Sequence, residues 1–148
     1  MPSEADMSTN FAGYLLKFAY GETEAVFPHK YLAQKPKLKP NQRMEAEAYR
    51  DAAANLHRVT LDNHKSRMEF TTVSGVTLEQ KIEMETAMAA GLINTTQRKY
   101  HLEFWNDDVG VNDYTEGDFY LVDPEYSPIK ITDETIVYDA VKYVFVEY

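Results

Sequence analysis

The chain has 148 residues, of which 44% are hydrophobic and 13% aromatic, and it carries a formal net charge of −9 without any cysteine. This length suits one domain with its own hydrophobic core, and the lack of cysteine excludes a disulfide framework and a thiolate metal site. The 11 tyrosines and 7 phenylalanines favour strands, because aromatic side chains suit the half-buried surface of a sheet. We therefore expect a mainly antiparallel β fold of the α+β type.

Charge is distributed unevenly along the chain. Residues 30–67 contain nine basic and four acidic residues, whereas residues 103–148 contain twelve acidic and two basic ones. Opposite charges at two ends of a molecule can orient contacts between copies. The alternative is that both ends are simply solvated.

The first ten residues, Met1–Asn10, are small and polar, with no basic start and no apolar run. They are expected to form an N-terminal arm and not a signal peptide, followed by a single β-rich domain over residues 11–148. No apolar run approaches the roughly 18 residues that a membrane helix needs.

The domain opens with two expected extended stretches, Gly13–Ala19 and Glu24–Leu32, with a turn at Gly21 between them. The segment that follows, Lys35–Asn41, alternates lysine and proline, which favours an extended, solvated conformation. We interpret it as a linker or as an arm along a sheet edge.

Residues 43–73 are expected to contain a hairpin. Met44–Asn55 is rich in helix formers but is near the marginal length for a lone helix. We favour a strand over Arg43–Tyr49, a turn over Asp51–Asn55 and a returning strand from Leu56. Ser66–Val73 alternates polar and apolar residues, as a half-buried strand does.

One amphipathic helix is predicted at about residues 77–91. Thr77 and Gln80 have the spacing of a capping box, and Gly91 stands where a left-handed helix end is common. Glu85 interrupts the apolar face, which indicates either an interfacial position or a face that is only partly covered. The expected apolar face consists of Leu78, Ile82, Ala89 and Leu92, with Met88 at its edge.

The remainder of the chain returns to strand patterns. Strands are expected at residues 98–106, 119–122 and 129–132, with a polar loop over 106–117. Residues 136–148 are interpreted as one long strand. Both of its faces are apolar near the end, so we expect the core to cover one face and something else to cover the other.

Motifs that carry chemistry are missing from the sequence. The four histidines form no HExxH pair, and there is no phosphate-binding glycine loop and no GxSxG nucleophile. We therefore expect no catalysis, no cofactor and no metal site. Cation binding by the acidic loop 106–118 stays open because oxygen-rich loops can bind calcium, although the spacing of this loop is not that of an EF-hand. The acidic composition also argues against sequence-specific nucleic-acid binding.

Several short motifs resemble those of a known protein family. They are Arg50-Asp51, Leu56-His57-Arg58 and Glu69-Phe70-Thr71-Thr72, together with RKYHLEFWN at 98–106 and NDYTEGDFY at 112–120. In these the chain resembles small tail-module structural proteins, from the tail tube or baseplate region, of long-tailed phages and prophages of Gram-positive bacteria.

The resemblance implies a virion structural subunit that is made in the host cytoplasm. Such a protein would be a β-sandwich or split barrel of the tail-tube or hub type, assembling with copies of itself in a ring and with other tail or baseplate proteins. The alternative function is a tail-tip receptor- or carbohydrate-binding module, in which Trp105 and Tyr114 would stack on a ligand. The interface candidates are Lys35, Lys37, Lys39, Arg43, Glu85, Tyr143, Phe145 and Tyr148.

Overall fold

The computed structural model describes residues 9–32 and 36–148, with only the backbone at 43–49 and 57–64. Lys35 and most of the expected N-terminal arm lie outside these ranges. The elements are β1 (Leu16–Tyr20), β2 (Thr23–Val26), a 3-10 turn (His29–Tyr31), β3 (Lys37–Arg50), β4 (Leu56–Thr71), β5 (Val76–Thr77), α1 (Leu78–Ala89), β6 (Leu92–Asn94), β7 (Lys99–Asn106), β8 (Asp113–Leu121), β9 (Pro128–Ile131), β10 (Ile136–Tyr138) and β11 (Lys142–Glu147).

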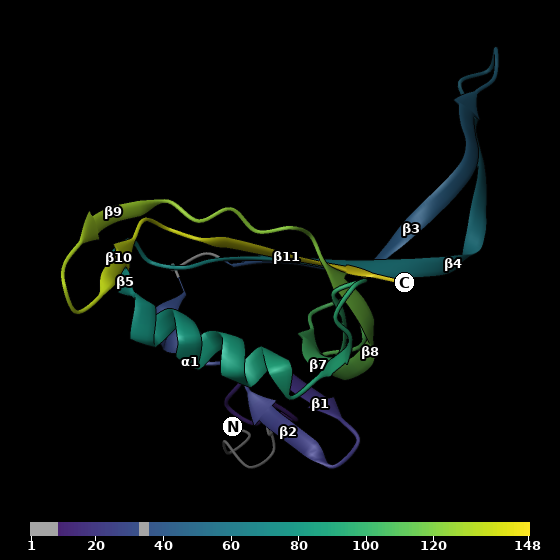
Figure 1. The fold of residues 1–148 in the computed structure, drawn as a ribbon. Coiled ribbons are helices and arrows are strands. Elements are labelled where there is room, and N and C mark those ends of the chain that lie inside the picture. Colours follow the sequence, from purple (N-terminus) through teal and green to yellow (C-terminus); the bar gives the residue numbers. More distant parts are fainter. Residues whose placement is uncertain (1–8, 33–35) are drawn as a thin grey trace, which may run out of the picture.

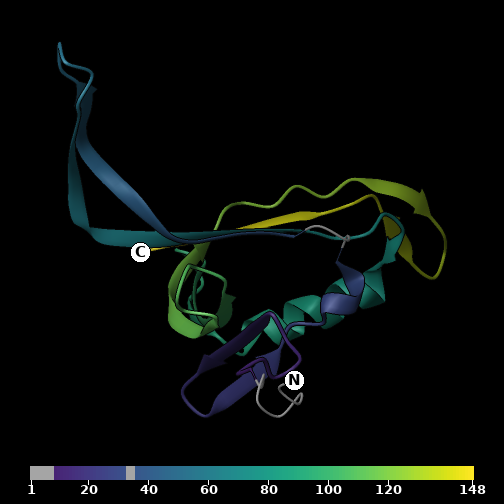
Figure 2. The ribbon, with the colours of Figure 1, turned by 180° about the vertical axis from the view of Figure 1, so that it is seen from behind.

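The main sheet has eight antiparallel strands. Its order is β2-β1-β7-β8-β11-β4-β3, with β6 added beside β7, and a second sheet has the order β5-β10-β9. Figure 1 shows the main sheet curving around α1, with β4 and β11 passing on one side of the helix and β1 and β2 on the other; the reverse view in Figure 2 agrees. The prediction of a mainly antiparallel β fold with one helix is confirmed.

The hydrophobic core lies between the concave face of the main sheet and α1. Alternate residues of each central strand point into it, as the period of two in a strand requires. The phenylalanines at its centre are fully buried and come from six separate segments of the chain: Phe18, Phe27, Phe70, Phe104, Phe119 and Phe145. This shared aromatic core ties the two ends of the chain together.

The start of α1 matches the sequence prediction. The Thr77 hydroxyl accepts a hydrogen bond from the Gln80 backbone N–H, and the Gln80 side chain accepts one from the Thr77 N–H, which is a complete capping box. The predicted apolar face was wrong at Ile82, which is 49% exposed, and at the exposed Ala89, whereas Leu78 does pack against the core. The buried face instead presents Met84 and Met88, whose flexible side chains fill the hollow of the curved sheet. Within the described part of the chain, no helix is both long and apolar enough to cross a membrane.

The glycine after α1 has a different role from the one predicted. The helix ends at Ala90 with ordinary right-handed geometry (φ −62°), so a left-handed end at Gly91 was wrong. A Cβ on Gly91 would lie 2.3 Å from the backbone oxygen of His101, and the Gly91 carbonyl accepts a hydrogen bond of 2.7 Å from the His101 N–H. The position therefore needs glycine because two backbone segments meet there.

The long C-terminal strand is interrupted. Residues 139–141 separate β10 from β11, and these two strands belong to different sheets. The Asp139 carboxylate accepts hydrogen bonds from the Ser74 hydroxyl and the Ala140 N–H, and the Val141 N–H donates to the Thr72 hydroxyl. These contacts explain why an apolar run read as one strand changes direction in its middle.

Three other boundaries differ from the sequence prediction. The second extended stretch stops at Val26, since residues 29–31 form the 3-10 turn. The lysine-proline segment is part of the edge strand β3 from Lys37 onward. The strand β8 begins at Asp113, which shortens the expected polar loop to residues 107–112.

Candidate interaction surfaces

The β3–β4 hairpin is only partly embedded in the main sheet. Strand β11 pairs with β4 from Arg67 to Thr71, whereas the rest of β4, from Leu56 to Lys65, pairs with β3 alone. Figure 1 shows this outer part of the hairpin leaving the body and turning sharply away from it. We call residues 42–65 the distal ribbon and the remainder of the hairpin its base.

Bulges and polar contacts build the bend at the foot of the distal ribbon. The strand register shifts between Lys39 and Gln42 and at two further steps beyond it, and such irregularities bend a strand pair. At the bend Asn41 has a positive φ of 50° and its N–H donates to the Ser66 hydroxyl. The Asn41 side-chain amide donates to Asp108 at 3.1 Å, which connects the bend to the loop at 107–112.

The tip of the distal ribbon is the turn that the sequence predicted. The Asp51 carboxylate accepts hydrogen bonds from the N–H groups of Ala53 and Asn55, at 2.9 and 3.0 Å. The Arg50 guanidinium donates to the carbonyl of Ala54, which has a positive φ of 66°. The Arg50-Asp51 pair that contributes to the family resemblance thus builds this turn.

The outer face of the main sheet carries cations around a small aromatic group. The strand register places Lys99, Tyr120, Arg67 and Lys39 in one row across β7, β8, β4 and β3, with β11 between β8 and β4. The Lys99 ammonium lies 4.7 Å from the centre of the Tyr148 ring, which packs edge-on against Tyr120. This face is the one that α1 does not cover.

Glu69 lies among the cations of the outer face. Its side chain is only 11% exposed, and its carboxylate is 3.3 Å from Arg67 and 3.6 Å from Lys142. Burial alone would raise the pKa of Glu69, but the charges of Lys142, Lys39 and Arg67 and the Arg67 hydrogen bond outweigh burial and hold the pKa below its ordinary value. The β3, β4 and β11 part of the outer face therefore carries more positive than negative charge, whereas Lys99 on β7 is paired with Asp118 at 3.8 Å.

A groove opens beside this aromatic group. Its rim carries an ion pair of 3.3 Å between the Arg98 guanidinium and the Asp123 carboxylate, and Tyr120 and Val122 are exposed large hydrophobic residues on it. The groove is lined by Thr96, Gln97, Arg98, Tyr120, Leu121, Val122 and Asp123. None of these residues was predicted as a site residue, although Arg98 and Tyr120 belong to the resemblance motifs, because the groove forms only where the end of β8 passes the turn before β7.

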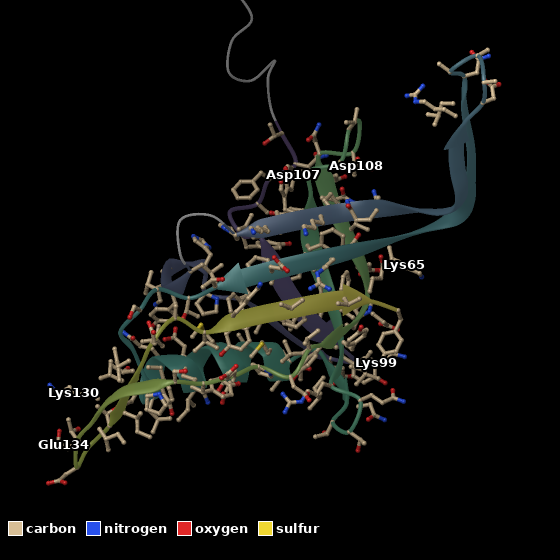
Figure 3. All side chains as sticks on the ribbon, turned by 90° about the horizontal axis from the view of Figure 1, so that it is seen from above. Lys65, Lys99, Asp107, Asp108, Lys130 and Glu134 are labelled. Carbon is tan, nitrogen blue, oxygen red and sulfur yellow. The ribbon has the colours of Figure 1, made fainter. Side chains whose placement is uncertain are left out.

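The β9–β10 hairpin exposes apolar residues at the far end of the molecule. Ile129 and Ile131 are 57% and 75% exposed, and β9 is the edge strand of the small sheet. Figure 3 shows Lys130 and Glu134 at one extremity of the molecule, with Lys65 and Lys99 toward the other. The hairpin and the groove are therefore well separated within one chain.

Trp105, the ligand candidate, is already engaged by its own chain. Its ring packs edge-on against Phe11 and Tyr114, with centroid distances of 5.4 and 5.2 Å, and its indole N–H donates to Asp107 at 2.6 Å. The Tyr114 hydroxyl donates to the Tyr14 carbonyl at 2.8 Å. These contacts favour a structural role for both Trp105 and Tyr114, which fix the residues before β1 against the sheet.

His101 is the one histidine among the described side chains that lies within a carboxylate cluster. Its Nδ1 is 2.8 Å from Asp118 and its Nε2 is 3.5 Å from Glu116. The hydrogen bond to Asp118 is the main cause that raises the pKa of His101, while burial opposes it. No nucleophile accompanies this group, and the described residues contain no set of three or more ligating side chains for a metal ion.

The expected interface residues differ in how far the structure exposes them. Lys37, Lys39 and Tyr148 are exposed, and Glu85 is partly buried in an ion pair with Lys81. Tyr143 and Phe145 are fully buried in the core, so their assignment to an intermolecular seam was wrong. Of the other two candidates, Lys35 lies outside the described residues and the side chain of Arg43 is not described.

Comparison with known proteins identifies the family of the chain. A family described as "Family of unknown function (DUF6711)" matches residues 7–148. The chain belongs to this family. The DUF6711 chain is also similar to a chain in a solved structure of the tail of an empty GTA particle with C6 symmetry, at 6% sequence identity and a TM-score of 0.49 over 95% of each chain. No curated protein matches the DUF6711 chain.

Proposed function

We propose that this chain is a virion structural subunit of a phage tail, which forms a ring of copies in the tail tube, hub or baseplate and performs no catalysis. The observation that carries the proposal is the distal ribbon, a pair of strands that continues beyond the sheet without a third strand beside it. A two-stranded ribbon of this kind is marginally stable in water on its own. Contact with a second copy would supply the stabilising contacts that the ribbon does not receive from the body of its own chain.

The edges of the ribbon support an intermolecular contact. Strand β3 is the last strand of the main sheet, and an edge strand leaves backbone donors and acceptors available for another chain. A ribbon that reaches from one copy to a different surface of the next makes a head-to-tail contact, and such contacts close into a ring when the rotation between copies permits.

The family resemblance supports the same region. Arg50-Asp51 and Leu56-His57-Arg58 fall on the tip and the returning strand of the distal ribbon, and Glu69–Thr72 falls at the base of the hairpin. None of these motifs surrounds a pocket with catalytic groups in the described part of the chain. Their placement on the hairpin suits a role in assembly.

The test is the oligomeric state of the purified protein. In mass photometry and negative-stain electron microscopy, the wild-type chain is expected to form discrete rings at micromolar concentration. A variant in which Asn-Gly replaces residues 43–64, so that Gln42 and Lys65 flank a two-residue turn, is expected to stay monomeric. Its thermal unfolding should remain close to that of the wild type, because the base keeps its place in the sheet.

A matched control is Val109→Ser, which changes an almost fully exposed residue in another loop and should leave the rings intact. A wild-type protein that remains monomeric at high concentration would contradict the proposal, as would a shortened variant that still forms the same rings.

Charge at the base offers a second test. Lys37 and Lys39 are exposed on the edge strand, so reversal of both to glutamate is expected to weaken assembly more at low than at high salt, since salt screens exposed charges. Equal assembly of the K37E/K39E variant and the wild type at low salt would show that these two residues do not contribute to the interface.

A further inference from the structure

The β9–β10 hairpin has the features of a plug. Ile129 and Ile131 are two residues apart, so they share one face of β9, and both are largely exposed. Single exposed apolar residues are ordinary on a protein surface, whereas a pair on an edge strand at the extremity of the molecule marks a contact site. The turn at residues 132–135 holds this face by its own hydrogen bonds, in which the Thr132 hydroxyl accepts from the N–H groups of Glu134 and Thr135.

The groove beside Tyr120 and Val122 has the features of a matching socket. It combines an exposed tyrosine, an exposed valine and the buried Leu121 with the Arg98–Asp123 ion pair at its rim. An isoleucine side chain that entered it would contact the exposed Tyr120 and Val122, since the Leu121 side chain belongs to the core. The ion pair would remain at the edge of the contact, where it is solvated. Apolar centres with polar rims are the usual arrangement of protein interfaces.

The charges around the plug and the socket are complementary. Residues 125–134 contain three acidic residues and one basic residue, with Asp133 and Glu134 at the turn. The groove and the outer face beside it carry four cations, Arg98, Lys99, Arg67 and Lys142, against three carboxylates, Asp123, Asp118 and Glu69. The excess is one positive charge, and it is opposite in sign to the net charge of the hairpin. Complementary potentials of this kind orient two copies and suppress wrong registers.

Because the hairpin and the groove lie at separated ends of one chain (Figure 3), they can meet only between two copies. We propose that the β9–β10 hairpin of one copy inserts Ile131 into the groove formed by Arg98, Tyr120 and Val122 of the next copy. This inference rests on the proposed ring and names one of its contacts. It is a heterologous contact, in which each copy offers a plug on one side and a socket on the other.

Cysteine cross-linking tests the pairing directly, because the natural chain has no cysteine. The I131C/V122C double variant is assembled into rings and oxidised, and the products are separated without reductant. A ladder of covalent dimers, trimers and higher species is expected, since each copy carries one cysteine on the plug and one in the socket. Each single variant should form rings but run as a single uncrosslinked chain on the same gel.

The matched control pairs I131C with V26C, which places the second cysteine on another exposed valine, in the edge strand β2. Rings of I131C/V122C that give no ladder, or a ladder equally strong with V26C, would overturn the inference while the proposed function stands. A wild-type chain that forms no rings would instead overturn the proposed function, and the inference with it.

A non-covalent measurement completes the test. The side chain of Ile131 is mostly in solvent, so the Ile131→Asp substitution is expected to leave thermal unfolding unchanged. It should raise the concentration at half-assembly by about tenfold or more, which corresponds to the loss of one apolar anchor. Ser127→Asp places the same charge on an exposed residue just before β9 and should have a smaller effect. Equal half-assembly concentrations for the wild type and Ile131→Asp would contradict the proposed insertion of Ile131 into the groove.

Discussion

The base and the distal ribbon of the β3–β4 hairpin belong to the same two strands but have different surroundings. In the base, Met68 and Phe70 are fully buried and β11 pairs with β4. In the distal ribbon, Leu56 is 51% exposed and β3 and β4 pair only with each other. The comparison indicates that the base stabilises the domain, whereas the ribbon is available for contacts with other molecules.

The largest effect is expected from a cavity in the base. Phe70→Ala removes a fully buried ring that packs near Phe27, and such substitutions lower the free energy of unfolding by about 3–5 kcal/mol. Urea denaturation followed by circular dichroism measures this change. Leu56→Ala is the matched substitution in the ribbon and should alter the same quantity by less than about 0.5 kcal/mol. Equal losses in the two variants would show that base and ribbon are one cooperative unit.

A second effect concerns the body, at the crossing between Gly91 and the backbone of His101. Gly91→Ala puts a Cβ 2.3 Å from the His101 carbonyl oxygen, so we expect a loss of about 1–3 kcal/mol in the free energy of unfolding. In a relaxed site the same substitution would stabilise the protein by reducing the entropy of the unfolded chain. A rise in the melting temperature of Gly91→Ala would therefore contradict the close approach.

A smaller effect is expected in the dependence of stability on pH. The folded protein raises the pKa of His101 above its ordinary value of 6.5, so it binds the proton more tightly than the unfolded chain does. The stabilisation is complete below pH 6.5 and is lost as the pH rises through the folded pKa. His101→Gln should remove this decline, which denaturation at a series of pH values measures. The effect is modest because Glu116 is mostly exposed and solvent screens the pair.

The smallest effect on global stability is expected at the tip of the ribbon. Ala54 has a positive φ of 66°, which glycine adopts without steric penalty. Ala54→Gly should slow hydrogen exchange of the amides in the turn, while the melting temperature of the whole domain stays within experimental error. A clear rise in that melting temperature would show that the ribbon unfolds together with the body and would blur the contrast with the base.

Local patterns in the sequence predicted local structure well. The capping box at Thr77 and Gln80, the turn held by Asp51 and the strands around it all depend on neighbours within a few residues. Alternation also implies that Tyr143 and Phe145, two residues apart in the expected C-terminal strand, share one face of it. It could not tell that this face is the core and not a seam between copies, because that depends on which strands meet it from elsewhere in the chain.

The long-range features were missed for the same reason. The groove needs the end of β8 beside the turn before β7, and the interruption between β10 and β11 depends on contacts with Ser74 and Thr72. The helix face was misassigned because Ile82 satisfies the helical spacing as well as Met84 does. Only the curvature of the sheet decides which of the two side chains is enclosed.

The register shifts at the foot of the ribbon have a consequence for solubility. A long, regular edge strand is a template on which identical chains can stack without limit, as in fibrils. Here Pro40 lacks a backbone donor and the ladder is irregular at three successive steps. The edge is thereby unsuited to open-ended stacking, and association is restricted to geometries that follow its curvature.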